Sequence, residues 1–303
     1  MQASDLLSEN PSTTLPTPNN DDSILPLGVG VLNWGADLKK ACAAFKSYTP
    51  AAVWFFAPRS LDDLVRWTEE VRAATQRKTH IWVQVGTVAG AVDVTRACKP
   101  EVLIVQGQDA GGHGLDAGAG LLALFPEVQD ALEREFPERK EKDELPILVA
   151  AGGIVEGRGA AAALALGAGG VVLGTRYLAS YEANISRGYR DAVLAAKDGG
   201  VTTVRSGVYD YLRGTTEWPE GYGGRGVINQ SYRDHLSGMS LDENRGLYEK
   251  EMNKGDEGWG DNARMTTYAG TGVGLVKEVM GAREITEEVR EEAARRLEMA
   301  RGS

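Results

Sequence analysis

The chain has 303 residues, of which 42% are hydrophobic and 25% are charged, a composition typical of soluble globular proteins. Its 33 basic and 43 acidic residues give a net charge of −10 with no basic stripe, which argues against nucleic acid and anionic membranes as partners. The two cysteines are isolated from each other, so we expect no disulfide framework, no cysteine metal site and a reducing, cytoplasmic location. No apolar run approaches the roughly 20 residues of a membrane span.

The N-terminal residues are polar and rich in proline. Residues 8–23 carry almost no apolar side chains and cannot bury enough surface to order themselves. We therefore expect residues 1–23 to form a disordered or loop arm, and residues 24–303 to form one domain that ends in an irregular and helical segment, 181–303.

From Leu25 onward, short apolar runs alternate with segments of helical periodicity. Such a rhythm, with strands that are apolar throughout, indicates a parallel sheet covered on both faces or a closed barrel, and hence an α/β fold. Ser60, followed by Asp63 three residues later, is typical of a helix N-terminus. The predicted strands span 25–32, 51–57, 80–86, 102–107, 147–153 and 170–175, and helices are expected at 36–45, from 60, at 89–98, 121–136 and 159–167.

Beyond these units the pattern weakens. The charged run 133–144 is predicted to be a solvated connector, and 181–197 to be helical. Residues 202–212 alternate weakly, and 213–262 are rich in glycine, asparagine and tryptophan, which suggests irregular structure. A last helix is expected from Thr286, because acidic residues in its first turn and arginines near its end complement the helix dipole.

A glycine-rich segment around His113 follows the strand predicted at 102–107. Glycines let a backbone approach a ligand closely, since they lack Cβ and adopt positive φ freely. Histidine, with an ordinary pKa of roughly 6.5, exchanges protons at physiological pH. A strand that delivers it into a glycine loop is how parallel α/β proteins present a base to a substrate. The alternative is that His113 only caps a turn by bonding a backbone carbonyl.

Two further glycine motifs end the last two predicted strands, AAGGI at 150–154 and LGTRY at 173–177. In an eightfold (β/α) barrel the loops at these places commonly hold a phosphate through backbone N–H groups. Their glycines would admit a phosphate, and the Thr175 hydroxyl would add a hydrogen bond. These glycines are alternatively simple strand-end turns, but their recurrence after two consecutive strands favours a phosphorylated cofactor or substrate across the strand ends.

The stretches VQGQDAGGHG (105–114), AAGGIVEGRGAAAALALGA (150–168) and GVVLGTRYLA (170–179) resemble the nitronate monooxygenase family, formerly called 2-nitropropane dioxygenases. The resemblance is strongest with the fungal-type branch, covers most of residues 24–300 and includes TYAGTGVGLV (267–276). Family members are FMN-dependent TIM barrels that oxidise alkyl nitronates with dioxygen to a carbonyl compound and nitrite. The resemblance therefore implies a TIM-type barrel with extra C-terminal helices, an FMN cofactor, a nitronate or nitroalkane substrate, and dioxygen.

The resemblance also implies roles for individual residues. His113 matches the catalytic base, which would remove the proton α to a nitro group before the nitronate reduces the flavin. Tyr268 lies near the flavin by family likeness. No metal is expected, because reduced flavin activates oxygen and the sequence has no clustered ligand set. Residues implied to bind the cofactor are Gln106, Gly111, Gly112, Gly152, Gly153, Val172, Leu173, Gly174 and Thr175.

The chain also departs from the family pattern. A full barrel needs eight strand–helix units, whereas six are recognisable here, and the first two, including a segment like Asn-Ala-Pro-Met, have no match. Gly30 stands where many bacterial relatives place an asparagine. We therefore expect a shortened barrel with unpaired edges at 25–32 and 170–175 and weak flavin binding. Such a barrel is left open, or is closed by 202–212, by the N-terminal arm or by a partner chain.

Other functions remain open at this point. One is another FMN-barrel oxidoreductase, such as an NAD(P)H-dependent enoyl-thioester reductase. Another is a catalytically impaired flavin- or phosphate-binding remnant, which the missing strands favour and the retained His113 disfavours. The tryptophans at 34, 54, 82 and 218 either line a substrate pocket or pack in the core, and strand tryptophans mostly pack.

Overall fold

A computed structural model describes residues 24–141 and 144–302 of the chain, so the predicted arm at 1–23 lies outside the described residues. The described residues divide into two compact units, one of residues 24–84 and 93–102 and one of residues 85–92, 103–141 and 144–302. Each unit is described by itself below. The single domain expected over 24–303 stays a prediction.

The first unit contains parallel strands that alternate with helices. In its sheet β1 pairs with β2 and β2 with β3, and Val53 of β2 lies opposite both Val29 and Ile81. Helix α3 begins where predicted, because the Ser60 hydroxyl accepts the Asp63 N–H at 3.1 Å. The elements are β1 (Leu25–Leu32), α2 (Leu38–Ser47), β2 (Pro50–Phe56), α3 (Leu61–Ala74), β3 (His80–Val85) and the part of α4 (Val88–Cys98) that follows Val92.

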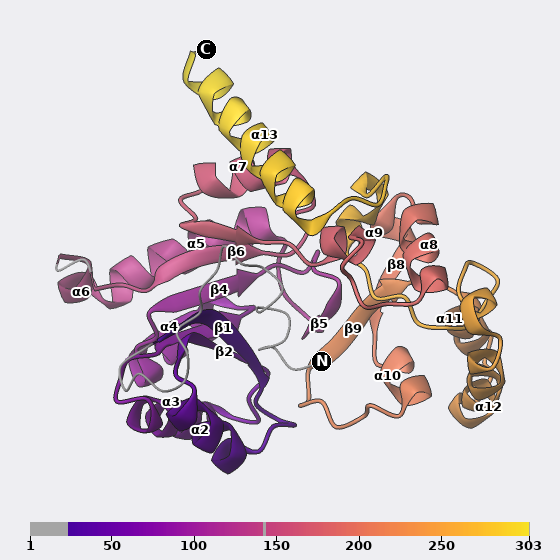
Figure 1. The fold of residues 1–303 in the computed structure, drawn as a ribbon, viewed down its shortest axis with the longest axis horizontal. Helices are drawn as coiled ribbons and strands as arrows, with labels where there is room; N and C mark the ends of the chain where they lie inside the picture. The colour runs from indigo at the N-terminus through magenta and orange to yellow at the C-terminus, as the bar shows by residue number, and fades with distance from the viewer. Residues whose placement is uncertain (1–23, 142–143, 303) are drawn as a thin grey trace. The chain divides into compact units, whose positions relative to one another are not determined.

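The second unit carries the remaining strands of the predicted rhythm. Strand β4 lies next to β6, and β6 pairs in parallel with β7 (Figure 1). All six strands expected from the apolar runs are present, which confirms the α/β fold. The last is shorter than predicted, because a 3₁₀ helix starts at Thr175. The elements are β4 (Val102–Gln106), α5 (Leu121–Glu135), β6 (Ile147–Ala151), α7 (Gly157–Ala165), β7 (Gly170–Val172) and η1 (Thr175–Ala179).

The expected open edges are present. Among the described residues, β1 pairs only with β2 and β7 only with β6. Each edge thus leaves a row of backbone N–H and C=O groups without a neighbouring strand. The segment 202–212 does not close these edges, because its strand β8 (Thr203–Ser206) belongs to a second sheet.

That second sheet was not expected. The glycine loop after β4 contains a strand, β5 (Gly112–Leu115), which pairs antiparallel with β9 (Tyr222–Val227), and β9 pairs in turn with β8. The prediction of a loop through Gly114 was therefore wrong at its C-terminal end. Neither GHGL nor YGGRGV alternates apolar and polar residues, so the sequence pattern carries no strand signal there.

Several other expectations need correction. The region 213–262 is not irregular, since β9, α11 (Gln230–Leu236) and α12 (Leu241–Met252) occupy much of it. Both helices are capped by side chains of Asn229 and Ser240, a signal present in the sequence. Within 181–197 only α8 (Arg187–Ala195) is helical, and the charged connector includes the end of α5 and a short helix, α6 (Pro137–Glu141). The remaining elements are α9 (Gly199–Thr202), α10 (Val208–Arg213), η2 (Gly255–Gly258), η3 (Thr271–Leu275) and α13 (Ala282–Gly302).

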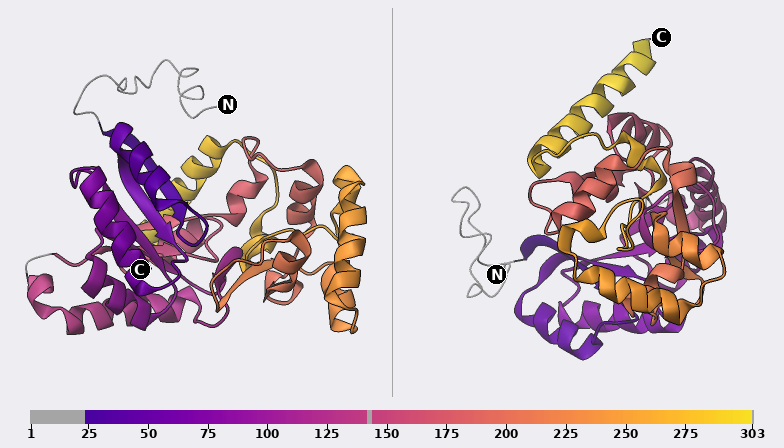
Figure 2. Two further views of the ribbon diagram at one scale, coloured as in Figure 1. Left: turned by 90° about the horizontal axis from the view of Figure 1, so that it is seen from below. Right: turned by 90° about the vertical axis from the view of Figure 1, so that its right-hand side faces the viewer.

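Helix α13 begins four residues before the predicted Thr286 and crosses α7 (Figures 1 and 2). The crossing requires a glycine, because a Cβ at Gly157 would lie 2.3 Å from Cβ of Glu292. The Glu292 carboxylate also accepts the Gly157 N–H at 3.1 Å. None of the helices within the described residues is long and apolar enough to cross a membrane.

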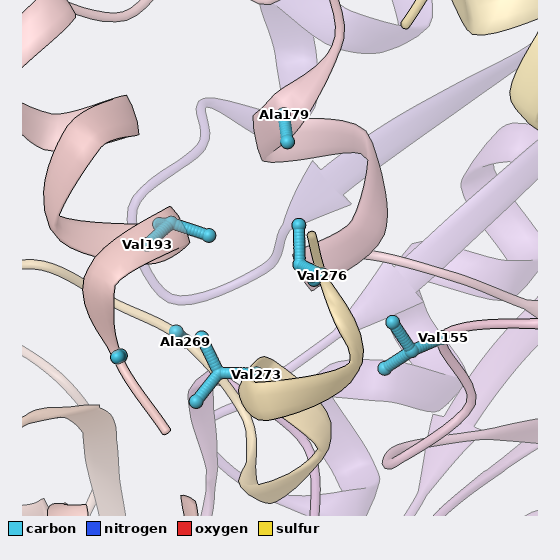
Figure 3. Close-up of a cluster of buried hydrophobic side chains, with 7 residues drawn as sticks. Val155, Ala179, Val193, Ala269, Val273 and Val276 are labelled. Carbon is cyan, nitrogen blue, oxygen red and sulfur yellow. The ribbon is translucent and has the colours of Figure 1, made fainter. Parts of the chain in front are cut away.

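A cluster of buried aliphatic side chains lies beneath the strand-end loops of the second unit (Figure 3). Three segments meet in this cluster. Val155 comes from the loop after β6, Ala179 from the end of η1 and Val273 from η3. The segment from 269 to 276 is thus held in place by the three buried side chains that it contributes to this cluster. The cluster consists of Val155, Ala179, Val193, Ala196, Ala269, Val273 and Val276.

Candidate active site

His113 lies on β5 between a carboxylate and an aromatic ring. Its Nε2 is 2.8 Å from Oδ1 of Asp210 in α10. The ring of Trp218 stacks on the imidazole with a centroid separation of 3.7 Å and an interplanar angle of 7°. Trp218 therefore belongs to the immediate surroundings of His113 in the candidate site. Trp54 packs beside Trp82, with ring centroids 6.4 Å apart.

The carboxylate of Asp210 receives two further donors. The hydroxyls of Thr215 and Tyr268 both lie 3.1 Å from Oδ1, the oxygen that faces His113. The Tyr268 ring is 5.3 Å from the imidazole, and the Arg213 guanidinium is 5.4 Å from the Tyr268 ring centroid. Burial, together with the negative charge of Asp210, raises the pKa of Tyr268, so the phenol stays neutral and donates.

The segment Tyr268–Thr271 connects this imidazole site to the predicted phosphate loops. Two residues after Tyr268, the N–H of Gly270 donates to Oγ1 of Thr175 at 3.0 Å. Thr271 then bonds Asp109 twice, from its N–H to the carbonyl at 3.0 Å and from its hydroxyl to the carboxylate at 2.7 Å. One short segment thus contacts the surroundings of His113, the loop after β4 and the loop after β7.

Three of the predicted glycines are required by close packing of these loops. A Cβ at Gly111 would lie 2.4 Å from the Gly270 nitrogen. Gly152 has φ +98°, and a Cβ there would lie 2.7 Å from the carbonyl oxygen of Gly107. At Gly153, with φ +77°, it would lie 2.9 Å from the Asp109 Cβ. A larger residue at any of the three would push the loops apart.

Other predicted positions border open space. No atom lies within 4 Å of a Cβ placed at Gly112 or Gly174. Among the described residues, no hydrogen bond engages the backbone N–H of Gly153 or Gly174. The Thr175 hydroxyl accepts from Gly270 and still has its own proton to donate. These donors are of the kind that a phosphate takes.

The other implied cofactor residues lie beside these loops. Val172 ends β7 opposite Ala151 of β6, and Leu173 follows it. Gln106 ends β4, but its amide nitrogen donates to the carbonyl of His113 at 3.2 Å. The Gln106 side chain therefore supports the backbone of His113. Its contact with a cofactor stays a prediction.

Sequence reasoning missed Arg205, which holds the glycine loop in place from β8. Its Nη1 donates to the carbonyls of Gly112 and Gly223, at 2.9 and 2.7 Å. Its Nη2 donates to the carbonyls of Ala110 and Gln108, at 2.7 and 3.5 Å, and its Nε to the Gln108 amide oxygen at 3.3 Å. Arg205 is 93 residues from Gly112 in sequence, so no local pattern connects the two.

Burial, together with the neighbouring positive charge of Arg225, lowers the pKa of Arg205 to about 10. The Arg225 guanidinium also donates to the carbonyl of Gln108, at 3.2 Å. Two guanidinium groups thus bind the carbonyls of a single loop. The fork of donors on arginine suits this arrangement, whereas the compact ammonium of lysine does not.

We expect Arg205→Lys to loosen the loop that carries His113. Losing several charge-assisted hydrogen bonds should lower the free energy of unfolding by on the order of 2 kcal/mol. Urea titration followed by circular dichroism measures the shift in midpoint. Arg187→Lys is the matched control, because Arg187 is 80% exposed on α8 and pairs only with Asp191 in the described structure. Equal midpoints for the two variants would contradict the role assigned to Arg205.

The fold and the site together define a class of protein: a parallel α/β chain that places an imidazole beside glycine loops at its strand ends. The structure is similar to FabK from Thermotoga maritima, with a TM-score of 0.69 and 25% identity over 100% of this chain and 85% of that one. It is also similar to nitroalkane oxidase from Streptomyces ansochromogenes, with a TM-score of 0.66 and 21% identity over 91% and 82% of the two chains. Both neighbours have TIM-barrel folds, which confirms the predicted fold class.

Residues 66–292 match the family model for nitronate monooxygenase. The chain is 46% identical to nitronate monooxygenase npaC of Metarhizium robertsii over 295 residues, 96% of this chain and 79% of that protein. It is 40% identical to nitronate monooxygenase of Neurospora crassa over 257 residues, 82% and 65% of the two. The chain belongs to the nitronate monooxygenase family, in agreement with the resemblance to the fungal-type branch. It is an oxidoreductase, and membership in this family implies a flavin cofactor.

Proposed function

We propose that this chain binds FMN and oxidises alkyl nitronates with dioxygen to a carbonyl compound and nitrite. His113 serves as the general base when the substrate is a neutral nitroalkane. The observation that carries this proposal is the segment Tyr268–Thr271, which joins the surroundings of His113 to Thr175 in the loop after β7. This connection supports a single site for the proposed base and the proposed phosphate donors.

The residues present fit an FMN phosphate. The N–H groups of Gly153 and Gly174 and the hydroxyl of Thr175 would hold it, and Gly174 leaves the approach open. When bound, the flavin supplies an acceptor for the electrons of the substrate and transfers them to dioxygen. Every residue assigned to the phosphate lies in a loop after β6 or β7, as in TIM barrels generally.

His113 has the surroundings of a base. Its side chain is 15% exposed, so a substrate reaches it while Trp218 covers one face. The imidazole takes the proton α to the nitro group, which converts the nitroalkane to its nitronate. Trp218 excludes water from that face and fixes the plane of the ring.

Anaerobic reduction of the flavin tests the proposed function. We expect a preformed alkyl nitronate to bleach the visible absorption of the chain reconstituted with FMN, whereas NAD(P)H leaves it unchanged. In air, the same mixture should consume oxygen and release nitrite. Bleaching by NAD(P)H alone would instead support a reductase of the enoyl-thioester type. Absence of bleaching by either compound would support a catalytically impaired flavin-binding remnant.

A further inference from the structure

We propose that Asp210 is the positioning residue for the base: its carboxylate holds His113 in the tautomer protonated at Nε2 and leaves Nδ1 to accept the substrate proton. The inference rests on the proposed function of His113. It assigns a role to a residue whose contact with His113 spans 97 positions in the sequence.

The geometry of the pair fixes the tautomer. Nε2 of His113 lies 2.8 Å from Oδ1 of Asp210, and the two side chains are 15% and 7% exposed. An ionised carboxylate only accepts hydrogen bonds, so in the neutral imidazole the proton shared with it resides on Nε2. Among the described residues, no hydrogen bond engages Nδ1. The lone pair on Nδ1 is therefore the one available for a substrate proton.

The carboxylate itself is held in place. Thr215 and Tyr268 donate to the same oxygen that faces the imidazole, each at 3.1 Å. These two hydrogen bonds oppose rotation of the Asp210 side chain away from His113. Thr215 follows the C-cap of α10, Gly214, whose φ of +72° turns the chain back toward Asp210.

The imidazole is constrained at two further points. Trp218 stacks on it almost in parallel, which opposes rotation of the ring out of its plane. Gln106 donates to the backbone carbonyl of His113, which fixes the residue on β5. Asp210 adds the remaining constraint, because it determines which nitrogen of the His113 ring carries the proton.

The assigned step conserves atoms and charge. The bond between the substrate α-carbon and its hydrogen breaks, and a new N–H bond forms at Nδ1. The electron pair of the broken bond passes into the nitronate, and the positive charge of the imidazolium faces Asp210. No oxidant takes part in this step, so it is separate from the later oxidation of the nitronate.

Asp210→Asn tests the assignment, with Asp242→Asn as its matched control. Asp242 lies in the first turn of α12 and accepts only a surface hydrogen bond from Tyr211 among the described residues. An asparagine at 210 can turn an NH₂ donor toward Nε2 and thereby favour the wrong tautomer. We expect kcat/KM for a neutral nitroalkane to fall roughly 100-fold or more. Oxidation of the preformed nitronate should stay within a factor of a few, and Asp242→Asn should match the wild-type chain on both substrates.

Nitrogen-15 NMR of the imidazoles gives a readout that does not depend on activity. The chain has 3 histidines, so His113→Asn identifies the signals of His113 by difference. We expect wild-type His113 to be protonated at Nε2 and Asp210→Asn to shift the proton toward Nδ1. Protonation at Nδ1 in the wild-type chain would overturn the proposal, as would equal nitroalkane rates for wild type and Asp210→Asn. If the wild-type chain oxidises no nitronate, the proposed function fails, while the NMR measurement still decides whether Asp210 sets the tautomer.

Discussion

Replacing His113 by asparagine is expected to abolish turnover of a neutral nitroalkane while leaving oxidation of the preformed nitronate largely intact. General-base catalysis contributes on the order of 10² to 10⁴ in rate, and that contribution is lost only when the substrate still carries its α-proton. Asparagine places a planar, polar amide beside Trp218 but has no basic ring nitrogen. The measurement is oxygen consumption with each substrate at saturating FMN.

The control for this prediction is His80→Asn. His80 is an exposed residue at the start of β3, and its replacement should leave both rates near wild type. Equal losses on nitroalkane and nitronate in His113→Asn would show that His113 acts in oxidation or in folding instead of proton removal.

Gly111→Ala is expected to destabilise the chain and to release its flavin. The added methyl group would meet the backbone of Ala269 and Gly270 at 2.5 and 2.4 Å, and backbone cannot move aside as a flexible side chain can. Overpacking of this kind costs typically about 1–3 kcal/mol. Because the Gly270 N–H is hydrogen-bonded to Thr175, a displacement of Gly270 would also shift the predicted phosphate loop. Thermal unfolding and the FMN content of the purified protein measure the two effects.

Alanine variants at two further glycines distinguish an effect on the stability of the protein from an effect on flavin binding. Gly246 lies within α12 with open space around it, so Gly246→Ala should be neutral or stabilise by about 0.5–1 kcal/mol. Gly174 also borders open space, so Gly174→Ala should keep the stability of the apoprotein and weaken retention of FMN. A Gly111→Ala protein as stable as Gly246→Ala would refute the packing role assigned to Gly111.

The strands were predictable because burial on both faces leaves a strong apolar signal. A run such as Val102–Val105 is too short for a helix and too apolar for a loop, and β4 forms there. The helix beginning after Ser60 was predictable for a local reason as well, since its capping residue lies beside it in sequence. Both signals are contained in windows of a few residues.

The surroundings of the imidazole were not predictable in this way. Asp210 and Tyr268 approach His113 only after the antiparallel sheet of β5 and β9 has formed, and that sheet is built from glycine-rich strands without alternation. The glycine motifs predicted loops that the structure brings into contact, as where Gly152 lies against the carbonyl of Gly107. They did not reveal that Gly111 and Gly152 are required by backbone packing within the protein.

The segment Tyr268–Thr271 connects the surroundings of His113 to Thr175 through hydrogen bonds from nearby residues. Gly270 is bonded to Thr175, and two peptide units earlier the Tyr268 hydroxyl is bonded to Asp210. Under the proposed function, a cofactor phosphate at Thr175 is therefore expected to affect the hydrogen bond that Tyr268 donates to Asp210, because only three consecutive residues, 268–270, separate the two contacts.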